Sequence, residues 1–198
     1  MVLRFRDVRR ALRHDPKATL QRRRDEQLPF VGSEASAGNG LLLDTCVYID
    51  QMQGRAPAVL EVLLSVRTVH HSAIAVQELL HVVGVLDPDD RRSRSVSRAV
   101  EKVIEAMPPH RLFTPDIDVS ARAALYAGIL SRTQGYAKDD RMRLLHDCVL
   151  YLQAAKLGLT VLTRNVVDFD LLNQLLPGGR VLFYRTVPRE AGEAAGPA

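Results

Sequence analysis

The sequence has no tryptophan, only two cysteines, and no apolar run approaching the ~18 residues that a membrane-spanning helix requires. Cys46 and Cys148 cannot form a disulfide framework, and neither belongs to a Cys-x-x-Cys or Cys/His cluster typical of zinc sites. The arginines near the N-terminus recur without an apolar stretch between them, which does not fit a secretory signal, and the acidic residues among them disfavour a transit peptide. We therefore expect a reduced, cytoplasmic protein with no membrane contact.

What is present is typical of a globular protein. The 198 residues are 46% hydrophobic and 25% charged, which suits one domain with appendages. The net charge of +4 is unevenly spread, because residues 1–28 hold nine basic and four acidic side chains. This segment therefore carries +5 and the remaining chain carries −1. A basic arm of this kind either contacts RNA or docks on an acidic partner, and composition does not separate the two.

After residue 40, strand-like and helix-like segments alternate, which predicts right-handed crossovers and a parallel sheet covered on both faces. We expect an α/β fold, a three-layer α/β/α sandwich with about five strands. The expected strands cover 40–44, 68–71, 111–114, 159–163 and 180–184. The expected helices cover 56–66, 72–86, 89–107, a segment from Asp116 or Asp118 to 133, 140–157 with a break or change of direction near His146, and 168–176.

Three further segments flank this domain, which we place at residues 41–187. Residues 1–30 form a basic extension that we expect to contain two short amphipathic helices, the second opened by Asp15 and Pro16. Residues 31–40 have the composition of a flexible linker, and residues 188–198 have that of a disordered tail.

Several polar residues follow strands or lie in apolar helical segments of this pattern. Asp44 closes the first strand, Glu78 lies in the helix after the second, and Asp147 lies in the apolar helix that precedes the fourth. Ligands bind at the carboxyl ends of the strands of open α/β sheets. Carboxylates that converge there repel one another unless a cation is shared, and such oxygen ligands suit Mg²⁺ or Mn²⁺. Metal-activated hydrolysis of a phosphodiester bond is the natural chemistry for this set.

Four segments resemble the motifs of PIN-domain ribonucleases, especially the VapC-type toxins of bacterial toxin–antitoxin modules. Residues 41–50 read LLLDTCVYID, residues 72–79 read SAIAVQEL, residues 145–150 read LHDCVL, and residues 160–169 read TVLTRNVVDF. Each motif alone is weak, but the four in this order are fairly specific. The resemblance covers about residues 40–187.

The resemblance implies a metal-dependent endoribonuclease in which Asp44, Glu78 and Asp147 are catalytic residues and ligands of Mg²⁺ or Mn²⁺. At the fourth acidic position the sequence departs from the family, because Asn165 stands where Asp is frequent and Asp168 follows three residues later. We therefore count Asn165 as a candidate ligand and Asp168 as a candidate catalytic acid. Asp168 is equally well explained as a helix cap.

The resemblance also implies an RNA substrate cut by metal-activated water without a covalent intermediate, a cognate antitoxin that plugs the acidic cleft, and homodimerisation. We assign substrate binding to Thr163 and Arg164, which end the fourth strand, and to Arg91 and Arg92 in the basic stretch 91–98, whose simpler explanation is a solvated helix face.

Two other functions compete with the nuclease. The Asn165 departure and the N-terminal extension are also compatible with a non-catalytic PIN-like module that binds RNA or protein. Aspartyl phosphotransfer of the haloacid-dehalogenase type is disfavoured, because it needs an Asp two residues after Asp44 and the chain has Cys46. We expect Asp50, Asp139 and Asp140 to be surface or capping groups.

Overall fold

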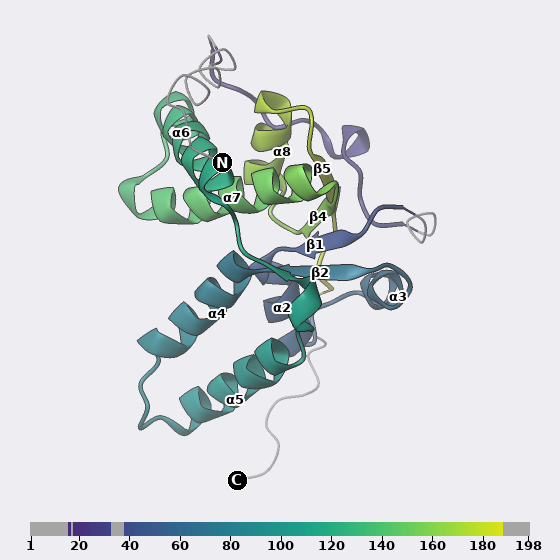
Figure 1. Cartoon of the computed structure of the whole chain (residues 1–198), viewed down its shortest axis with the longest axis vertical. Coiled ribbons are helices and arrows are strands. Elements are labelled where there is room, and N and C mark those ends of the chain that lie inside the picture. The colour runs from purple at the N-terminus through teal and green to yellow at the C-terminus, as the bar shows by residue number, and fades with distance from the viewer. Residues whose placement is uncertain (1–15, 17, 33–37, 188–198) are drawn as a thin grey trace.

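The computed structural model describes residues 16, 18–32 and 38–187. Its centre is a five-stranded sheet in which every strand pair is parallel, with the strand order β3-β2-β1-β4-β5 (Figure 1). The strands are β1 (Leu41–Leu43), β2 (Val69–Ser72), β3 (Leu112–Phe113), β4 (Thr160–Thr163) and β5 (Arg180–Phe183). The chain builds outward from β1 to β3 and then returns to the other side of β1, so the strand order reverses between β1 and β4. This switch point is where open α/β sheets bind their ligands.

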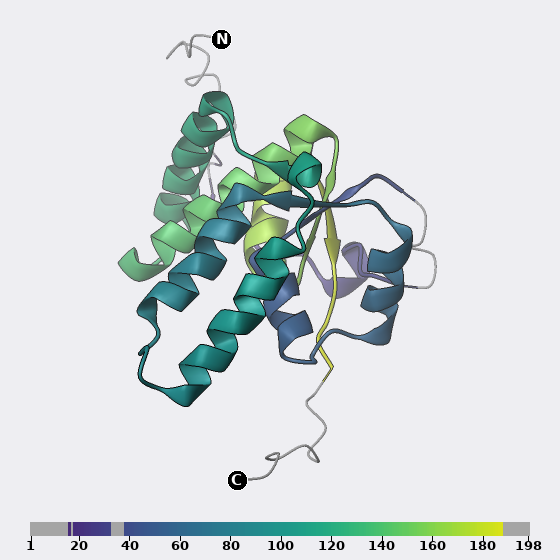
Figure 2. The same ribbon diagram turned by 60° about the horizontal axis from the view of Figure 1, so that its bottom comes forward.

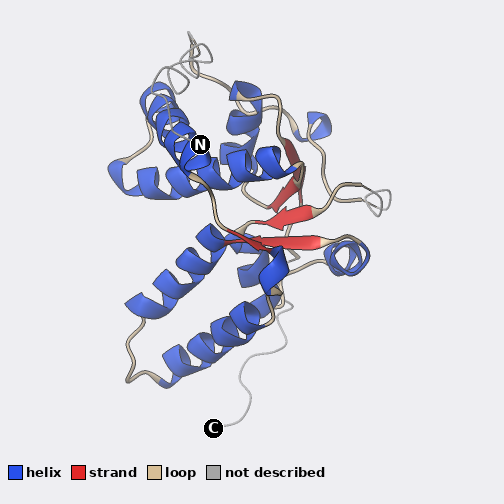
Figure 3. Cartoon of the chain, viewed as in Figure 1, coloured by secondary structure: helices blue, strands red, loops and turns tan. Residues whose placement is uncertain are grey.

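Helices cover both faces of the sheet, as the colours of Figure 3 make plain. One core lies beneath α6 (Ile117–Gln134), α7 (Arg141–Leu157) and α8 (Val166–Leu175). The other lies beneath α2 (Thr45–Met52), α3 (Ala58–Val66), α4 (Ala73–Val85) and α5 (Arg91–Glu105).

Alternation along the strands feeds these two cores. Leu42 and Val161 belong to the core under α6–α8, whereas Leu41, Leu43 and Leu162 belong to the opposite core. Successive side chains of a strand point to opposite faces, and a sheet covered on both faces therefore needs the continuous apolar run seen in β1. The α/β/α sandwich predicted from the sequence is confirmed.

Several helices begin or end at the capping residues that the sequence indicates. Ser72 accepts a hydrogen bond from the Ile74 N–H at 3.2 Å, and Asp90 accepts one from the Arg92 N–H at 2.8 Å. Asp116, rather than Asp118, caps α6. The α7 helix ends at a glycine, residue 158, with φ of 70°, a left-handed conformation that glycine adopts without strain.

Two expectations for the helices are wrong. The α7 helix runs unbroken through His146, because its flanking turns are anchored by buried apolar residues on both sides of that position. The α2 helix, Thr45–Met52, was not expected, and its β-branched residues have low helix propensity. Its buried side chains, including Val47 and Tyr48, show that packing sets its conformation.

Residues 18–31 lie along the β5 side of the sheet, and we call this segment the N-terminal strap. It contains one short 3₁₀ turn, Asp25–Gln27, and residues 18–24 are not helical, which contradicts the second of the two expected helices. Phe30 forms a parallel bridge with Phe183, and the buried Leu28 joins the core under α6–α8. The first expected helix, half of the expected linker (residues 33–37) and the tail at 188–198 fall outside the described residues.

The α4 and α5 helices form a hairpin that projects from the β2 and β3 side of the sheet, as the second view shows (Figure 2). Among the helices that the structure describes, none has both the length and the apolar character needed to cross a bilayer.

Candidate active site

A cavity of about 1070 Å³ opens at the carboxyl ends of β1 and β4, where the strand order reverses. Its lining includes Asp44, Glu78, Asp147 and Asn165, four of the residues singled out in the sequence. They come from the end of β1, from α4, from α7 and from the turn after β4. The topology therefore brings together acids that are far apart in the chain.

Asp44 is held at the end of β1 by two neighbouring side chains. Its side chain accepts hydrogen bonds from the Thr163 hydroxyl at 2.5 Å and from the Cys46 thiol at 2.9 Å. Burial raises the pKa of the Asp44 carboxyl, and the two donors partly offset that rise. Cys46 thus supplies a weak thiol donor to Asp44.

Thr163 is fully buried, so its hydroxyl reaches Asp44 rather than a bound substrate. The same hydroxyl accepts a hydrogen bond from the Asn165 N–H at 2.9 Å. Thr163, predicted from the sequence to bind substrate, therefore orients Asp44 and the turn after β4.

Asn165 links two acids through its side-chain amide. The Nδ2 atom donates to Asp147 at 3.0 Å and to Asp168 at 2.8 Å, and the Oδ1 atom accepts from the Asp168 N–H at 3.3 Å. The helix cap of α8 is therefore Asn165, and the capping role considered for Asp168 is wrong. Asp168 is buried and also accepts a hydrogen bond from the Tyr136 hydroxyl.

Glu78 is the most exposed of the acids, with a quarter of its side chain accessible. It accepts a hydrogen bond from the Thr45 hydroxyl, and the His146 Nδ1 atom lies 2.7 Å from its other oxygen. The sequence alone did not single out His146 as a functional residue. Its position one residue before Asp147, on the helix that faces the cavity, is the signal that points to this contact.

The carboxylates act strongly on one another. Burial raises the pKa of Asp147 well above its ordinary value, and the charges of Asp44, Asp168 and Glu78 raise it further. Within residues 16, 18–32 and 38–187, no three His, Cys, Asp or Glu side chains stand close enough to enclose an ion. The donor chemistry nevertheless fits a hard divalent cation, because buried oxygen ligands that repel one another are stabilised by a shared positive charge.

Basic residues form part of the rim of this acidic cavity. Arg164 lies at the rim, and its Nε atom is 2.8 Å from an oxygen of Asp50. Asp50 is fully buried and also binds Arg55 at 2.8 Å and the Tyr184 hydroxyl at 2.7 Å. The surface or capping role expected for Asp50 is therefore wrong, and this carboxylate holds Arg164 in place.

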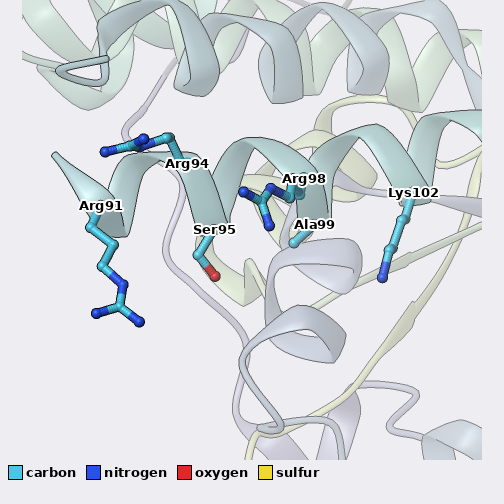
Figure 4. Close-up of a pocket in the computed structure, with 6 residues that line it drawn as sticks. All are labelled: Arg91, Arg94, Ser95, Arg98, Ala99 and Lys102. Carbon is cyan, nitrogen blue, oxygen red and sulfur yellow. The ribbon is translucent and has the colours of Figure 1, made fainter. Parts of the chain in front are cut away.

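The other two predicted substrate-binding residues do not reach the cavity. Arg91 lines a separate hollow of about 680 Å³ along one side of α5, together with Arg94, Arg98 and Lys102 (Figure 4). Arg92 is exposed on the same helix and lines neither cavity.

Comparison with known proteins finds solved structures with a similar fold. No family model and no curated protein matches the chain. The DNA-bound VapBC structure from Salmonella typhimurium matches with a TM-score of 0.52 and 19% identity, over 73% of this chain and 97% of that one. FitAcB from Neisseria gonorrhoeae matches with a TM-score of 0.50 and 24% identity, over 72% and 96%.

The FitAB structure bound to an IR36 DNA fragment has a TM-score of 0.50 and 22% identity, over 73% of this chain and 94% of that one. The chain has the PIN-domain fold of VapC-type toxins. This PIN fold accounts for the strand order and for the position of the cavity. At these identities the likeness establishes architecture, and the activity has to be argued from the residues.

Proposed function

We propose that this protein is a metal-dependent endoribonuclease and the toxin of a toxin–antitoxin pair. The observation that carries the proposal is the meeting of Asp44, Glu78 and Asp147 in one cavity at the switch point of a PIN fold. Their mutual repulsion in a buried place is what a bound cation would relieve. Nothing in this arrangement requires a nucleophilic side chain.

Asp44, Glu78 and Asp147 would hold Mg²⁺ or Mn²⁺, which when bound supplies an activated water and stabilises charge on the leaving oxygen. Thr163 fixes the Asp44 carboxylate through its 2.5 Å hydrogen bond. The contact between His146 and Glu78 limits the rotation of the glutamate. Asn165 fixes the position of the Asp147 carboxylate through its side-chain amide, which also binds Asp168.

Arg164 is suited to contact a substrate phosphate. Its guanidinium is fixed by the buried Asp50 through Nε, and two-fifths of its side chain is exposed at the rim. Guanidinium groups bind phosphate through paired N–H donors, and an arginine already held in place loses less entropy in doing so. The RNA backbone would therefore cross the cavity beside Arg164.

We further propose a cognate antitoxin as the protein partner, since the solved structures similar to this chain include VapBC and FitAB complexes. The FitAB structure and the Salmonella typhimurium VapBC structure are both bound to DNA. Homodimerisation stays a prediction from the family resemblance, and a cytoplasmic location stays a prediction from the composition of the sequence.

A non-catalytic RNA- or protein-binding module is the alternative, and Asn165 favours it. Its amide already occupies oxygens of Asp147 and Asp168, and it adds no negative charge to the site. A site with one fewer charge binds a second cation more weakly.

Cleavage of a total RNA pool with Mg²⁺ or Mn²⁺ separates the two functions. We expect the wild type to cut the pool, Asp44→Asn and Asp147→Asn to lose the activity, and Asp139→Asn to keep it. Asp139 is an exposed acid outside the cavity lining, so it controls for the loss of one charge. Equal cleavage by all four proteins would refute the nuclease, and metal-dependent cleavage lost in the two cavity variants alone would refute the non-catalytic module.

A further inference from the structure

The N-terminal strap is fastened to the domain by an ion pair between the partly exposed Arg23 and a buried carboxylate, Asp170. The Arg23 Nε atom lies 2.6 Å from one oxygen of Asp170, and the Arg23 backbone N–H donates to the other at 2.7 Å. Asp170 is fully buried in α8, and Gln174 adds a hydrogen bond at 3.0 Å. A charge buried to this degree needs its partner, so the strap belongs to the folded domain.

Further contacts fix the strap on both sides of Arg23. At its C-terminal end, the Val31 N–H donates to the Phe183 carbonyl at 2.7 Å, and the Phe183 N–H donates to the Pro29 carbonyl at 2.8 Å. At its N-terminal end, the Gln174 side chain donates to the Gln21 carbonyl at 2.9 Å. The intervening residues therefore have a defined place relative to the cavity.

That place puts Arg22 at the acidic cavity. Arg22 lines it together with Arg143 of α7 and Arg164, so three elements contribute arginines to the same opening. Asp25 pairs with the Arg22 guanidinium and also with Arg185, which fixes the Arg22 side chain from the strap itself. Arg22 keeps 35% of its side chain exposed.

The donors of Arg22 are only partly used. A guanidinium has five N–H donors. In the described part of the chain, those of Arg22 bind Asp25 and the Arg23 carbonyl. The remaining donors can bind an anion. Because the cavity floor carries carboxylates, a polyanion approaching it is repelled unless cations at the rim offset that repulsion.

We propose that the N-terminal strap is part of the substrate-binding surface and that Arg22 contacts a backbone phosphate of single-stranded RNA at the cavity. This inference rests on the proposed function and extends it, because it assigns a substrate contact to a segment outside the PIN motifs. RNA is favoured over an acidic protein segment because Arg22 lines the same cavity as the proposed metal ligands and Arg164. Regularly spaced phosphates can occupy both arginines at once.

The test is equilibrium binding of a fluorescent single-stranded RNA oligonucleotide to the full chain across a range of salt concentrations, with Ca²⁺ in place of Mg²⁺. Arg22→Ala is expected to weaken binding roughly tenfold, the effect of losing one charge-assisted contact. It should also reduce the magnitude of the slope of log K against log salt by about 0.7, as expected for one phosphate contact to a single strand.

Two further variants sharpen the comparison. Arg24→Ala removes an exposed arginine of the same strap that does not line the cavity, and it should bind as the wild type does. Arg22→Lys should keep most of the salt slope while binding more weakly, because it preserves the charge and loses the forked geometry. Melting temperatures of the variants within a few degrees of the wild type establish that the strap remains folded.

Several results would overturn the inference. They are equal binding by the Arg22→Ala and Arg24→Ala proteins, tighter binding or faster cleavage in Arg22→Ala, and absence of RNA binding by the wild type. Polyglutamate serves as a probe for an acidic protein segment in the same binding assay. If Arg22→Ala loses polyglutamate binding while its RNA binding is unchanged, the strap binds a protein partner instead. A wild type that binds RNA through Arg22 without cutting it would refute the nuclease and leave this inference standing. A wild type that cuts RNA while Arg22→Ala binds RNA normally would do the reverse.

Discussion

Replacing Asn165 with Asp changes the charge of the site with almost no change in shape. The new carboxylate can still cap α8 by accepting from the Asp168 N–H, because Asp is as good a cap as Asn. What disappears are the two amide hydrogen bonds, at 3.0 Å to Asp147 and 2.8 Å to Asp168. Each is replaced by an approach between two carboxylates.

The size of the effect follows from these two contacts. Hydrogen bonds to charged groups contribute about 1.5–3 kcal/mol each, so losing both costs at least about 3 kcal/mol if the acids stay ionised. The cost has an upper limit, because one carboxyl can take up a proton instead, which costs about 4 kcal/mol at pH 7 for a group of ordinary pKa and less for Asp147, whose pKa is raised by burial. We therefore expect Asn165→Asp to destabilise the metal-free protein by at most about 4 kcal/mol at pH 7, or at most roughly 16 °C in melting temperature.

The loss should depend on pH and on cations. A carboxyl whose pKa is raised by folding contributes stability below its unfolded pKa, and this stability is lost as the pH rises through the folded value. The difference between Asn165→Asp and wild type should thus grow from pH 4 to pH 7 and shrink when Mg²⁺ is added. Gln77→Glu is the matched control, since it adds the same charge on an exposed part of the cavity wall and should change stability by under about 0.5 kcal/mol.

Thermal unfolding of the wild type, Asn165→Asp and Gln77→Glu at both pH values, with and without Mg²⁺, measures these differences. If Asn165→Asp is as stable as wild type at pH 7 without metal, the amide does not separate the two acids. An equal loss at pH 4 and pH 7 would contradict the electrostatic origin.

Three further predictions follow from buried charges elsewhere. Arg23→Ala should lower the free energy of unfolding, measured with denaturant, by about 2 kcal/mol, while Arg24→Ala stays within about 0.5 kcal/mol of wild type. The loss is smaller than the roughly 3–5 kcal/mol of a fully buried pair because the arginine is partly exposed and Asp170 keeps other donors. Equal effects of the two substitutions would refute the role of Arg23 in fastening the strap. Asp147→Asn should stabilise the metal-free protein more at pH 7 than at pH 4, because the raised pKa makes the charged form costly as the pH rises, and a pH-independent effect would contradict this. Burial lowers the pKa of His71 to about 4, so its ring should titrate near pH 4 by NMR. The free energy of unfolding should accordingly fall as the pH drops from about 6.5 toward 4. Titration of the ring near pH 6.5 would contradict this prediction.

Much of the fold was predictable because its signals are local. The apolar run of β1 ends in Asp44, and the Ser72, Asp90 and Asp116 caps each bind a backbone N–H two or three residues away. Local signals of this kind survive in the sequence. The α2 helix was missed because its β-branched residues favour a strand and only packing against the core makes them helical.

The acids of the site were predictable, since they lie in the four motifs. The contacts that hold their side chains in place were not predictable. The Arg23–Asp170 contact joins residues 147 positions apart, and neither lies in a motif. Asp50 reads as a surface acid in the sequence, and its burial depends on Arg55, Arg164 and Tyr184 arriving from separate segments. Such contacts are set by tertiary packing, which no local pattern records.

The central claim is that the carboxylate cavity cuts RNA with a divalent cation, and its most direct test is a metal titration of the wild-type protein. The rate of RNA cleavage is measured after chelation and then as Mg²⁺ or Mn²⁺ is restored. The account predicts no cleavage in the chelated protein and a saturable rise as either cation is added. Cleavage that persists unchanged in the chelated protein would contradict it.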